Sequence, residues 1–292
     1  MSTVATVPAV LYYAAPLEPG GREDDWVIDA LSDPPALVLN FRKLSVATSI
    51  TDLRRSQMHP RLDAAGFEKL DVPTRVNQQA LVDGSSASLA AYQRETADLL
   101  LGMTNASAVV FFDATFRCEK SATPRGPGFA PAHLRVHVDQ NPRSARARAV
   151  VHGGAQRRFS RFQIINVWRP LLAPVKNFPL ALCDYRSLDV GAELVATRLR
   201  FPPWLQDREN YSVKYNPAHC WYYWDGMSPG EVIVFKCHDS ACQAVALGEH
   251  AESGLSMEVS GLCPHTAFFH AAAPVTGRLR TSLELRALLF YD

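Results

Sequence analysis

Residues 228–235, Ser228-Pro229-Gly230-Glu231-Val232-Ile233-Val234-Phe235, place a Pro-Gly turn directly before a run of apolar residues. Adjacent Pro and Gly are typical of turns, and a short apolar run rich in β-branched residues after a turn predicts a buried strand. Comparable runs, separated by Pro or Gly signals, occupy residues 109–112, 134–139, 162–167, 267–270 and 282–291. This density of short strands predicts a mainly β chain, built as a sheet sandwich or barrel.

The first third of the chain follows a different pattern. Residues 1–80 are rich in Pro, Asp and Arg and contain only short apolar runs, so we expect an extended arm that carries a strand or two. Residues 86–103 combine apolar Leu89, Tyr92 and Leu100 with intervening charged residues, a pattern that fits one amphipathic helix. The Ala/Arg run at 143–148 is expected to be a solvated loop.

A histidine and a carboxylate stand two residues apart in the predicted strand 134–139, at His137 and Asp139. Side chains at positions i and i+2 leave the same face of a strand, so both can reach one metal ion. Two histidines and one carboxylate form the facial set that holds Fe(II) in non-haem oxygenases and leaves the remaining coordination positions open. The pair therefore predicts two of the three ligands, and a distant histidine would complete the set.

The C-terminal third supplies a candidate for that histidine and for a cosubstrate anchor. His265 stands in the block Pro264-His265-Thr266-Ala267-Phe268, and Arg280-x-Ser282 opens the last predicted strand. A guanidinium is a planar fork suited to a carboxylate, and Ser282 shares the strand face of Arg280. The far carboxylate of 2-oxoglutarate is the anion that this pair would hold.

The order of these features, a turn and an apolar strand, then the late histidine, then the arginine strand, resembles a cupin-like double-stranded β-helix. Such jelly rolls enclose a cavity at one mouth, where residues from several strands converge. We expect one catalytic domain over residues 1–292 with flanking helices. Residues 1–105 would form the N-terminal arm and helix, and residues 106–292 the β-helix core.

Composition excludes several classes of protein. The chain has 292 residues, is 47% hydrophobic and carries a formal net charge of +1, so it lacks the broad basic field that nucleic acid requires. No uninterrupted apolar stretch is long enough for a membrane span, and no basic leader precedes an apolar segment, so we expect a cytoplasmic protein. The six cysteines form no C-x-x-C pair and are expected to be free thiols.

Several separated blocks resemble the fungal hydroxylase/desaturase family, which includes gibberellin desaturase-like enzymes and is related to the cephalosporin 7α-methoxylase subunit. The resemblance covers most of residues 110–292. The blocks are His137-Val138-Asp139-Gln140, Ile165-Asn166-Val167-Trp168-Arg169-Pro170-Leu171, Leu180-Ala181-Leu182-Cys183-Asp184, His219-Cys220-Trp221-Tyr222-Tyr223, Phe235-Lys236-Cys237-His238-Asp239-Ser240, Pro264-His265-Thr266-Ala267-Phe268 and Arg280-x-Ser282-x-Glu284-x-Arg286.

The resemblance implies an Fe(II)/2-oxoglutarate-dependent dioxygenase that uses O2 to hydroxylate or desaturate a small secondary-metabolite substrate. It implies His137, Asp139 and His265 as iron ligands and Arg280, with Ser282, as the 2-oxoglutarate anchor. Asn166 would face the same pocket and bond the C1 carboxylate of 2-oxoglutarate, unless its strand is simply part of the core.

Other interpretations stay open at this point. His238, His219 or His270 would each be an alternative to His265, and Arg286 would be an alternative to Arg280. A non-catalytic β-helix partner subunit of another biosynthetic enzyme is the competing function, although a complete ligand set argues against it. No strand followed by a G-x-G loop supports a nucleotide site. A homodimer is compatible with the sequence.

Overall fold

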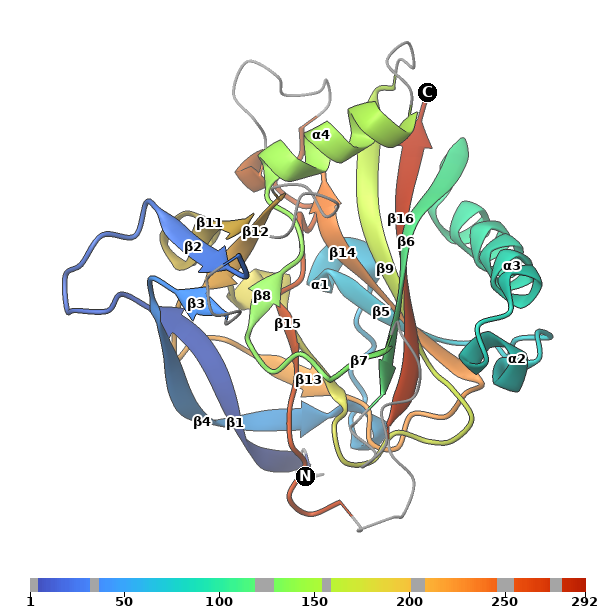
Figure 1. Cartoon of the computed structure of the whole chain (residues 1–292), viewed down its shortest axis with the longest axis horizontal. Helices are drawn as coiled ribbons and strands as arrows, with labels where there is room; N and C mark the ends of the chain where they lie inside the picture. Colours follow the sequence, from blue (N-terminus) through green and yellow to red (C-terminus); the bar gives the residue numbers. More distant parts are fainter. Residues whose placement is uncertain are drawn as a thin grey trace.

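The computed structural model describes residues 5–31, 37–118, 129–153, 159–200, 208–245, 255–273 and 280–292. Within them the strands form two sheets that face each other (Figure 1). The smaller sheet has the spatial order β5 (Phe67–Asp71), β14 (Glu231–Asp239), β9 (Arg161–Pro170), β16 (Thr281–Tyr291), β6 (Ala108–Cys118) and β7 (Phe129–Ala130). The larger sheet has the order β1 (Thr6–Ala15), β4 (Arg42–Asp52), β13 (Trp221–Tyr223), β10 (Leu180–Cys183), β15 (His265–Ala267), β8 (His137–Val138), β12 (Arg208–Val213), β11 (Leu194–Arg200), β2 (Trp26–Asp29) and β3 (Val38–Leu39).

The strand connections identify the architecture. The neighbours β14-β9-β16-β6 lie in the smaller sheet, and the neighbours β13-β10-β15-β8 lie in the larger one. Along the chain these strands follow in the sequence β6, β8, β9, β10, β13, β14, β15 and β16. Each step crosses to the other sheet except the step from β10 to β13, which are neighbours in the larger sheet, so the chain winds around a shared interior. This is a double-stranded β-helix, or jelly roll, and the expected fold is confirmed.

Most of the predicted strands occur, but two have shifted bounds. Of residues 134–139 the structure pairs only His137–Val138 as β8, because the chain bends at Asp139 and Arg135 makes only an isolated bridge to Tyr12. The strand expected at 267–270 lies earlier, as β15 at His265–Ala267. This shift places His265 inside a strand rather than before one.

The amphipathic helix is confirmed as α3 (Ser86–Thr104). The Ser85 side chain accepts a hydrogen bond from the Ser88 backbone N–H, a cap worth about 1 kcal/mol, and Asn105 ends the helix with a φ of 57°. Leu100 packs with Val167 and Val234 on the outer face of the smaller sheet. The remaining short helical segments are α1 (Leu62–Ala65), α2 (Gln78–Val82), α5 (Val190–Glu193), η1 (Leu53–Arg55), η2 (Tyr185–Ser187) and η4 (Gln243–Val245).

The loop expected at residues 143–148 is wrong, because these residues belong to helix α4 (Pro142–Gly153). The Asn141 side chain accepts a hydrogen bond from the Ser144 backbone N–H (2.8 Å), and Pro142 occupies the first helical position, where its missing N–H costs nothing. Alanine is the best helix former, and Ala145 and Ala149 are fully buried on one face of the helix. The loop prediction failed because it relied on the arginines of this segment and did not consider the alanines, which form the buried face of the helix.

The N-terminal segment contributes more strands than the one or two expected. Within its described residues, β1 to β4 belong to the larger sheet and β5 belongs to the smaller one. In these sheets β4 pairs with β13, β2 pairs with β11, and β5 pairs with β14. These pairings cover strand edges that would otherwise present unpaired backbone groups. The five N-terminal strands are therefore part of the two sheets rather than an arm laid over them.

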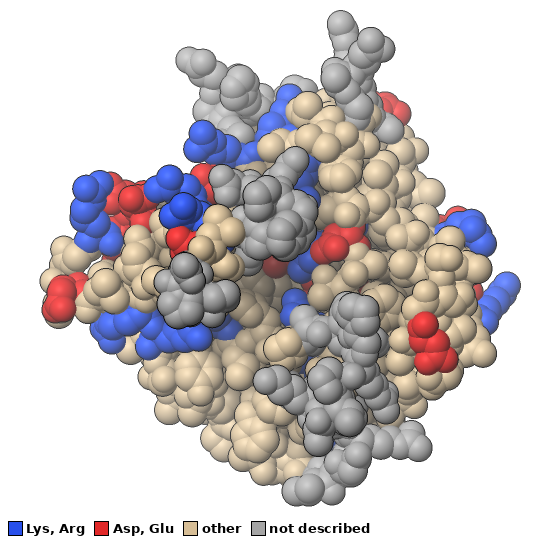
Figure 2. Space-filling view, viewed as in Figure 1, with Lys and Arg blue, Asp and Glu red and all other residues tan. Residues whose placement is uncertain are grey.

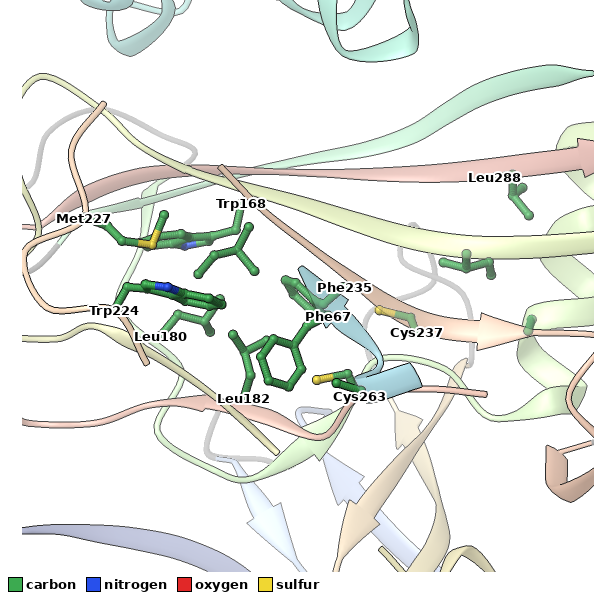
Figure 3. Close-up of a cluster of buried hydrophobic side chains, with 14 of the residues drawn as sticks. Phe67, Trp168, Leu180, Leu182, Trp224, Met227, Phe235, Cys237, Cys263 and Leu288 are labelled. Atoms are coloured by element: carbon green, nitrogen blue, oxygen red, sulfur yellow. The ribbon is translucent and has the colours of Figure 1, made fainter. Parts of the chain in front are cut away.

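The main apolar core fills the interior between the sheets and extends from Trp224 and Met227 to Leu288 (Figure 3). Burying one such large side chain contributes roughly 1.5–3 kcal/mol to folding. Residues of this core include Phe67, Trp168, Leu180, Leu182, Trp224, Met227 and Phe235. The two sheets therefore pack against each other through this core, beside the strands that carry His137 and His265.

All six cysteines are free thiols, as the sequence predicted. No helix in the described part of the chain combines the length and apolar character needed to cross a bilayer.

Candidate metal centre

The structure brings His137, Asp139 and His265 together. His137 on β8 lies directly opposite His265 on the neighbouring antiparallel strand β15, and their ring centroids are 4.4 Å apart. One ligand atom from each of the three residues lies within 4.8 Å of the other two. Both histidines are about 95% buried, so the set lies inside the jelly roll between the sheets.

Backbone hydrogen bonds set the orientation of both imidazoles. The Nδ1 atom of His137 lies 2.8 Å from the Arg135 carbonyl oxygen, and the Nδ1 atom of His265 lies 3.0 Å from the Cys263 carbonyl oxygen. A carbonyl oxygen only accepts, so each Nδ1 carries the proton and donates it. Each Nε2 then keeps its lone pair, the arrangement that histidine ligands of metals use.

The Asp139 carboxylate is held from the opposite sheet. Its Oδ2 atom accepts hydrogen bonds from Nε of Arg286 on β16 (2.9 Å) and from Nδ2 of Asn166 on β9 (2.8 Å). Its Oδ1 atom lies 3.3 Å from Nε2 of His137. One oxygen is therefore tied to the protein, and the other faces the histidine nitrogens.

Electrostatics favour a cation at this point. Burial, with a further contribution from neighbouring His265, lowers the pKa of His137 to about 4, so its imidazole is neutral near pH 7. Burial alone would raise the pKa of Asp139, but Arg286 and the His137 hydrogen bond outweigh it and hold that pKa well below its usual range. Arg286 also pairs with Glu284 and Asp113, so three carboxylates share one guanidinium. Two imidazoles, one carboxylate and this excess of negative charge suit Fe(II).

Ser282 lies near the start of β16, and Arg280 immediately precedes this strand. Both are buried; Nε of Arg280 lies 3.4 Å from the Ser282 hydroxyl, and one terminal nitrogen donates to the Phe178 carbonyl oxygen (2.6 Å). The Arg280 guanidinium stacks 5.3 Å from the Trp168 ring. The indole Nε1–H of Trp168 is buried without a hydrogen-bond partner among the described residues. An unused donor beside a guanidinium and a hydroxyl fits a site for a carboxylate.

Asn166 and Arg286 have roles that the sequence did not predict. The Asn166 amide nitrogen donates to Asp139 and to Glu284 (3.2 Å) instead of standing free for a carboxylate of 2-oxoglutarate. Arg286, considered above as an alternative anchor, is engaged by Asp139 and Glu284. Both residues hold the carboxylate of Asp139. The available signal was that Asn166 stands two residues before Trp168, and Arg286 two residues after Glu284, on strand faces that point inward.

The other candidate histidines lie elsewhere. His219 contacts the Glu193 carboxylate (2.7 Å), the His238 ring lies 5.1 Å from that of Phe162, and His270 bonds a tyrosine hydroxyl of β13 (3.2 Å). None of them belongs to the ligand group found among the described residues. One histidine that the sequence analysis overlooked, His133, packs edge-on against the His137 ring at 4.3 Å between ring centroids.

Substituting Arg286 with methionine is expected to weaken iron(II) binding about 10–100-fold, the usual effect of losing a residue that orients a metal ligand. The metal-free protein should also lose about 3–5 kcal/mol of stability, because buried carboxylates are left without their cation. Iron titration and urea unfolding measure the two effects.

Arg169→Met is the matched control. Arg169 is a buried arginine of β9, but it donates to Tyr92 and to the Pro229 carbonyl oxygen on the outer side of the sheet. It should cost stability and leave iron affinity unchanged. Unaltered iron binding in Arg286→Met would contradict the role given to Arg286.

Comparison with known proteins agrees with this geometry. Residues 11–290 match the family model described as "Oxidoreductase/YMDC permease-like domain". The chain belongs to this oxidoreductase family. It is 35% identical over 156 residues to aspirochlorine biosynthesis protein N of Aspergillus oryzae, a match that covers 52% of this chain and 59% of that protein. It is 27% identical to the hydroxylase/desaturase efuI of Hormonema carpetanum, with 83% of each chain covered.

A third relative, the Fe(II)/2-oxoglutarate-dependent dioxygenase nvfI of Aspergillus novofumigatus, is 26% identical with 92% of each chain covered. A solved structure of the endoperoxidase NvfI superposes over the whole of both chains with a TM-score of 0.80 at 23% identity, which supports the jelly-roll fold. The resemblance to the fungal hydroxylase/desaturase family is thereby confirmed.

Proposed function

We propose that this protein is a non-haem Fe(II)/2-oxoglutarate-dependent dioxygenase that hydroxylates or desaturates a C–H bond of a small secondary-metabolite substrate. The observation that carries the proposal is the convergence of His137, Asp139 and His265 inside a jelly roll of this oxidoreductase family. The names of relatives such as the nvfI dioxygenase and the efuI hydroxylase/desaturase support the cofactors and the reaction class.

His137 and His265 would hold iron through Nε2, and Asp139 through Oδ1, the atoms that their other hydrogen bonds leave available. Arg280, Ser282 and the Trp168 indole N–H would bind the far carboxylate of 2-oxoglutarate. The chemistry that bound iron(II), 2-oxoglutarate and O2 supply is oxidative decarboxylation coupled to removal of hydrogen from an unactivated C–H bond.

The chain itself contributes position and exclusion of water. Arg286 and Asn166 fix the angle of the Asp139 carboxylate. The three metal-binding side chains would therefore be in position before iron or 2-oxoglutarate binds. The Phe235 ring lies 4.6 Å from that of His265, and Leu182 lies opposite His265 on β10, so one side of the centre is walled by apolar groups. Such a wall protects a reactive centre from water.

A small-molecule substrate agrees with the oxygenase relatives. Two statements remain predictions: that the protein binds neither nucleic acid nor membranes, and that it forms a homodimer. A non-catalytic partner subunit, the alternative function, would be expected to lack a ligand or the anchor.

The test is succinate formation from 2-oxoglutarate by the full chain, loaded anaerobically with Fe(II) and then exposed to O2, with lipophilic candidate substrates added. We expect succinate above a metal-free control, and more of it with a true substrate. Wild-type protein that binds neither iron nor 2-oxoglutarate would overturn the oxygenase and leave the partner subunit as the better explanation.

A further inference from the structure

The sheet face that carries the two histidines continues past β8. Ser212 on β12 lies directly opposite His137, and Val195 on β11 lies opposite Ser212. Directly opposed residues of antiparallel strands project on the same side of a sheet. Asn210, two residues before Ser212, and Arg135, two residues before His137, share that side by strand alternation.

A buried polar strip therefore adjoins the candidate metal centre. We define it as Arg135, Thr197, Asn210 and Ser212; Thr197 and Ser212 are fully buried, and Asn210 and Arg135 are 5% and 6% exposed. The Thr197 hydroxyl donates to the Ser212 hydroxyl (2.8 Å), so the strip is an ordered group of side chains. On the surface of the molecule, acidic and basic side chains lie near the middle of the view in Figure 2, below α4.

Arg135 has more donors than the described residues use. One terminal nitrogen donates to the Ser212 hydroxyl (2.8 Å), and the guanidinium lies 6.0 Å from the Phe41 ring. No carboxylate of the described residues forms an ion pair with Arg135, in contrast to Arg286, which pairs with Asp139 and Glu284. A guanidinium carries five N–H donors in a planar fork, and a carboxylate is the acceptor that fills two of them at once.

A second observation on the strip is independent of Arg135. The Oδ1 atom of Asn210 is buried and has no hydrogen-bond partner among the described residues. Asn210 lies opposite Thr197 and one position along from the pair Tyr211 and Val138, which places it at the level of Asp139. Buried polar atoms of side chains are almost always satisfied, so this acceptor indicates a ligand that brings its own donor.

The cosubstrate anchor lies on the other flank of the two histidines. Arg280 contacts the Phe178 carbonyl oxygen next to β10, and the strands follow in the order β10, β15, β8, β12. The strip lies on β12, on β11 and at Arg135, which precedes β8. Two buried arginines, Arg280 and Arg135, therefore stand on opposite flanks of the two histidines.

Resting on the function proposed above, we propose that the polar strip binds the polar end of the substrate, with Arg135 pairing to a carboxylate of that molecule and Asn210 accepting a hydrogen bond from it. The substrate is then an organic acid whose carboxylate is held beside β12, and the C–H bond that reacts lies within one molecule's reach of that carboxylate.

The test compares acids with their own uncharged amides. Dissociation constants of 4-phenylbutyrate, cinnamate and decanoate, and of the three corresponding amides, are measured anaerobically on the Fe(II)-loaded full chain with saturating 2-oxoglutarate. Wild type is expected to bind at least one acid about tenfold or more tightly than its amide, the usual gain from a buried charged hydrogen bond. Arg135→Met should remove this preference, and Arg135→Lys should retain part of it.

Arg198→Met controls for general charge, because Arg198 is an exposed arginine of β11, 58% accessible, and its loss should leave the preference intact. Acids that bind wild type no more tightly than their amides, including the case in which neither binds, overturn the proposal, as does a preference that survives in Arg135→Met. A fall in 2-oxoglutarate affinity in Arg135→Met, with the acid preference unchanged, would assign Arg135 to the cosubstrate instead. Iron and 2-oxoglutarate binding by wild type report separately on the proposed function.

Discussion

Replacing His265 with alanine is expected to lower iron(II) affinity by more than about 100-fold. Loss of a residue that only orients a metal ligand already lowers metal affinity by about 10–100-fold. Succinate formation should fall to background. The physical reason is that His265 supplies one of three protein donors, and its Nδ1 proton is already fixed on the Cys263 carbonyl oxygen, so only Nε2 is left for the metal. Anaerobic iron titration followed by a single-turnover succinate assay measures both effects.

His238→Phe is the matched control for this substitution. His238 is as buried as His265, and its ring already lies against Phe162, so a phenyl ring fits the same surroundings. This variant should bind iron like wild type. If His238→Phe lost iron and His265→Ala kept it, the ligand set would need a different third member, and His219 and His270 would be examined in the same way.

Replacing Arg280 with methionine is expected to raise the KM for 2-oxoglutarate by about 100-fold, because truncating one partner of a buried charged pair costs 2–5 kcal/mol. Iron affinity should stay near the wild-type value, because Arg280 contacts Ser282, Trp168 and Phe178 and none of the proposed ligands. Steady-state kinetics with varied 2-oxoglutarate, together with iron titration, separates cosubstrate binding from metal binding.

Two further variants refine this result. Arg280→Lys keeps the charge and loses the planar fork, so it should recover part of the affinity. Ser282→Ala removes only a hydroxyl and should cost much less, since a single neutral hydrogen bond contributes about 1 kcal/mol. An unchanged KM in Arg280→Met, accompanied by intact folding on urea titration, would disprove the anchor and favour another cation.

Local patterns in the sequence were sufficient for much of the fold. Short apolar runs bounded by turn residues predicted the strands that became β9, β14 and β16, and the apolar spacing of residues 86–103 predicted α3. Period-two spacing also placed His137 and Asp139 on one side of their strand, and the structure brings both to His265. These features depend on residues a few positions apart, whose geometry the backbone alone sets.

The helix α4 shows where such reasoning ends. Its residues include three arginines and a histidine, and their charge indicated solvent, but Ala145 and Ala149 are buried because the chain folds back over the sheet interior. Short side chains allow that close approach, and composition does not report it.

The sequence by itself determined a mainly β chain, a His-x-Asp pair and an Arg-x-Ser pair with the chemistry of a metal and a carboxylate site. Only the tertiary structure decided which late histidine joins the pair and that Arg286 and Asn166 hold Asp139. It also decided that Arg135, just before β8, and Asn210 on β12 face the same interior. The reason is that strand pairing between distant segments, set by burial of the whole sheet face, chooses the register that makes these side chains neighbours.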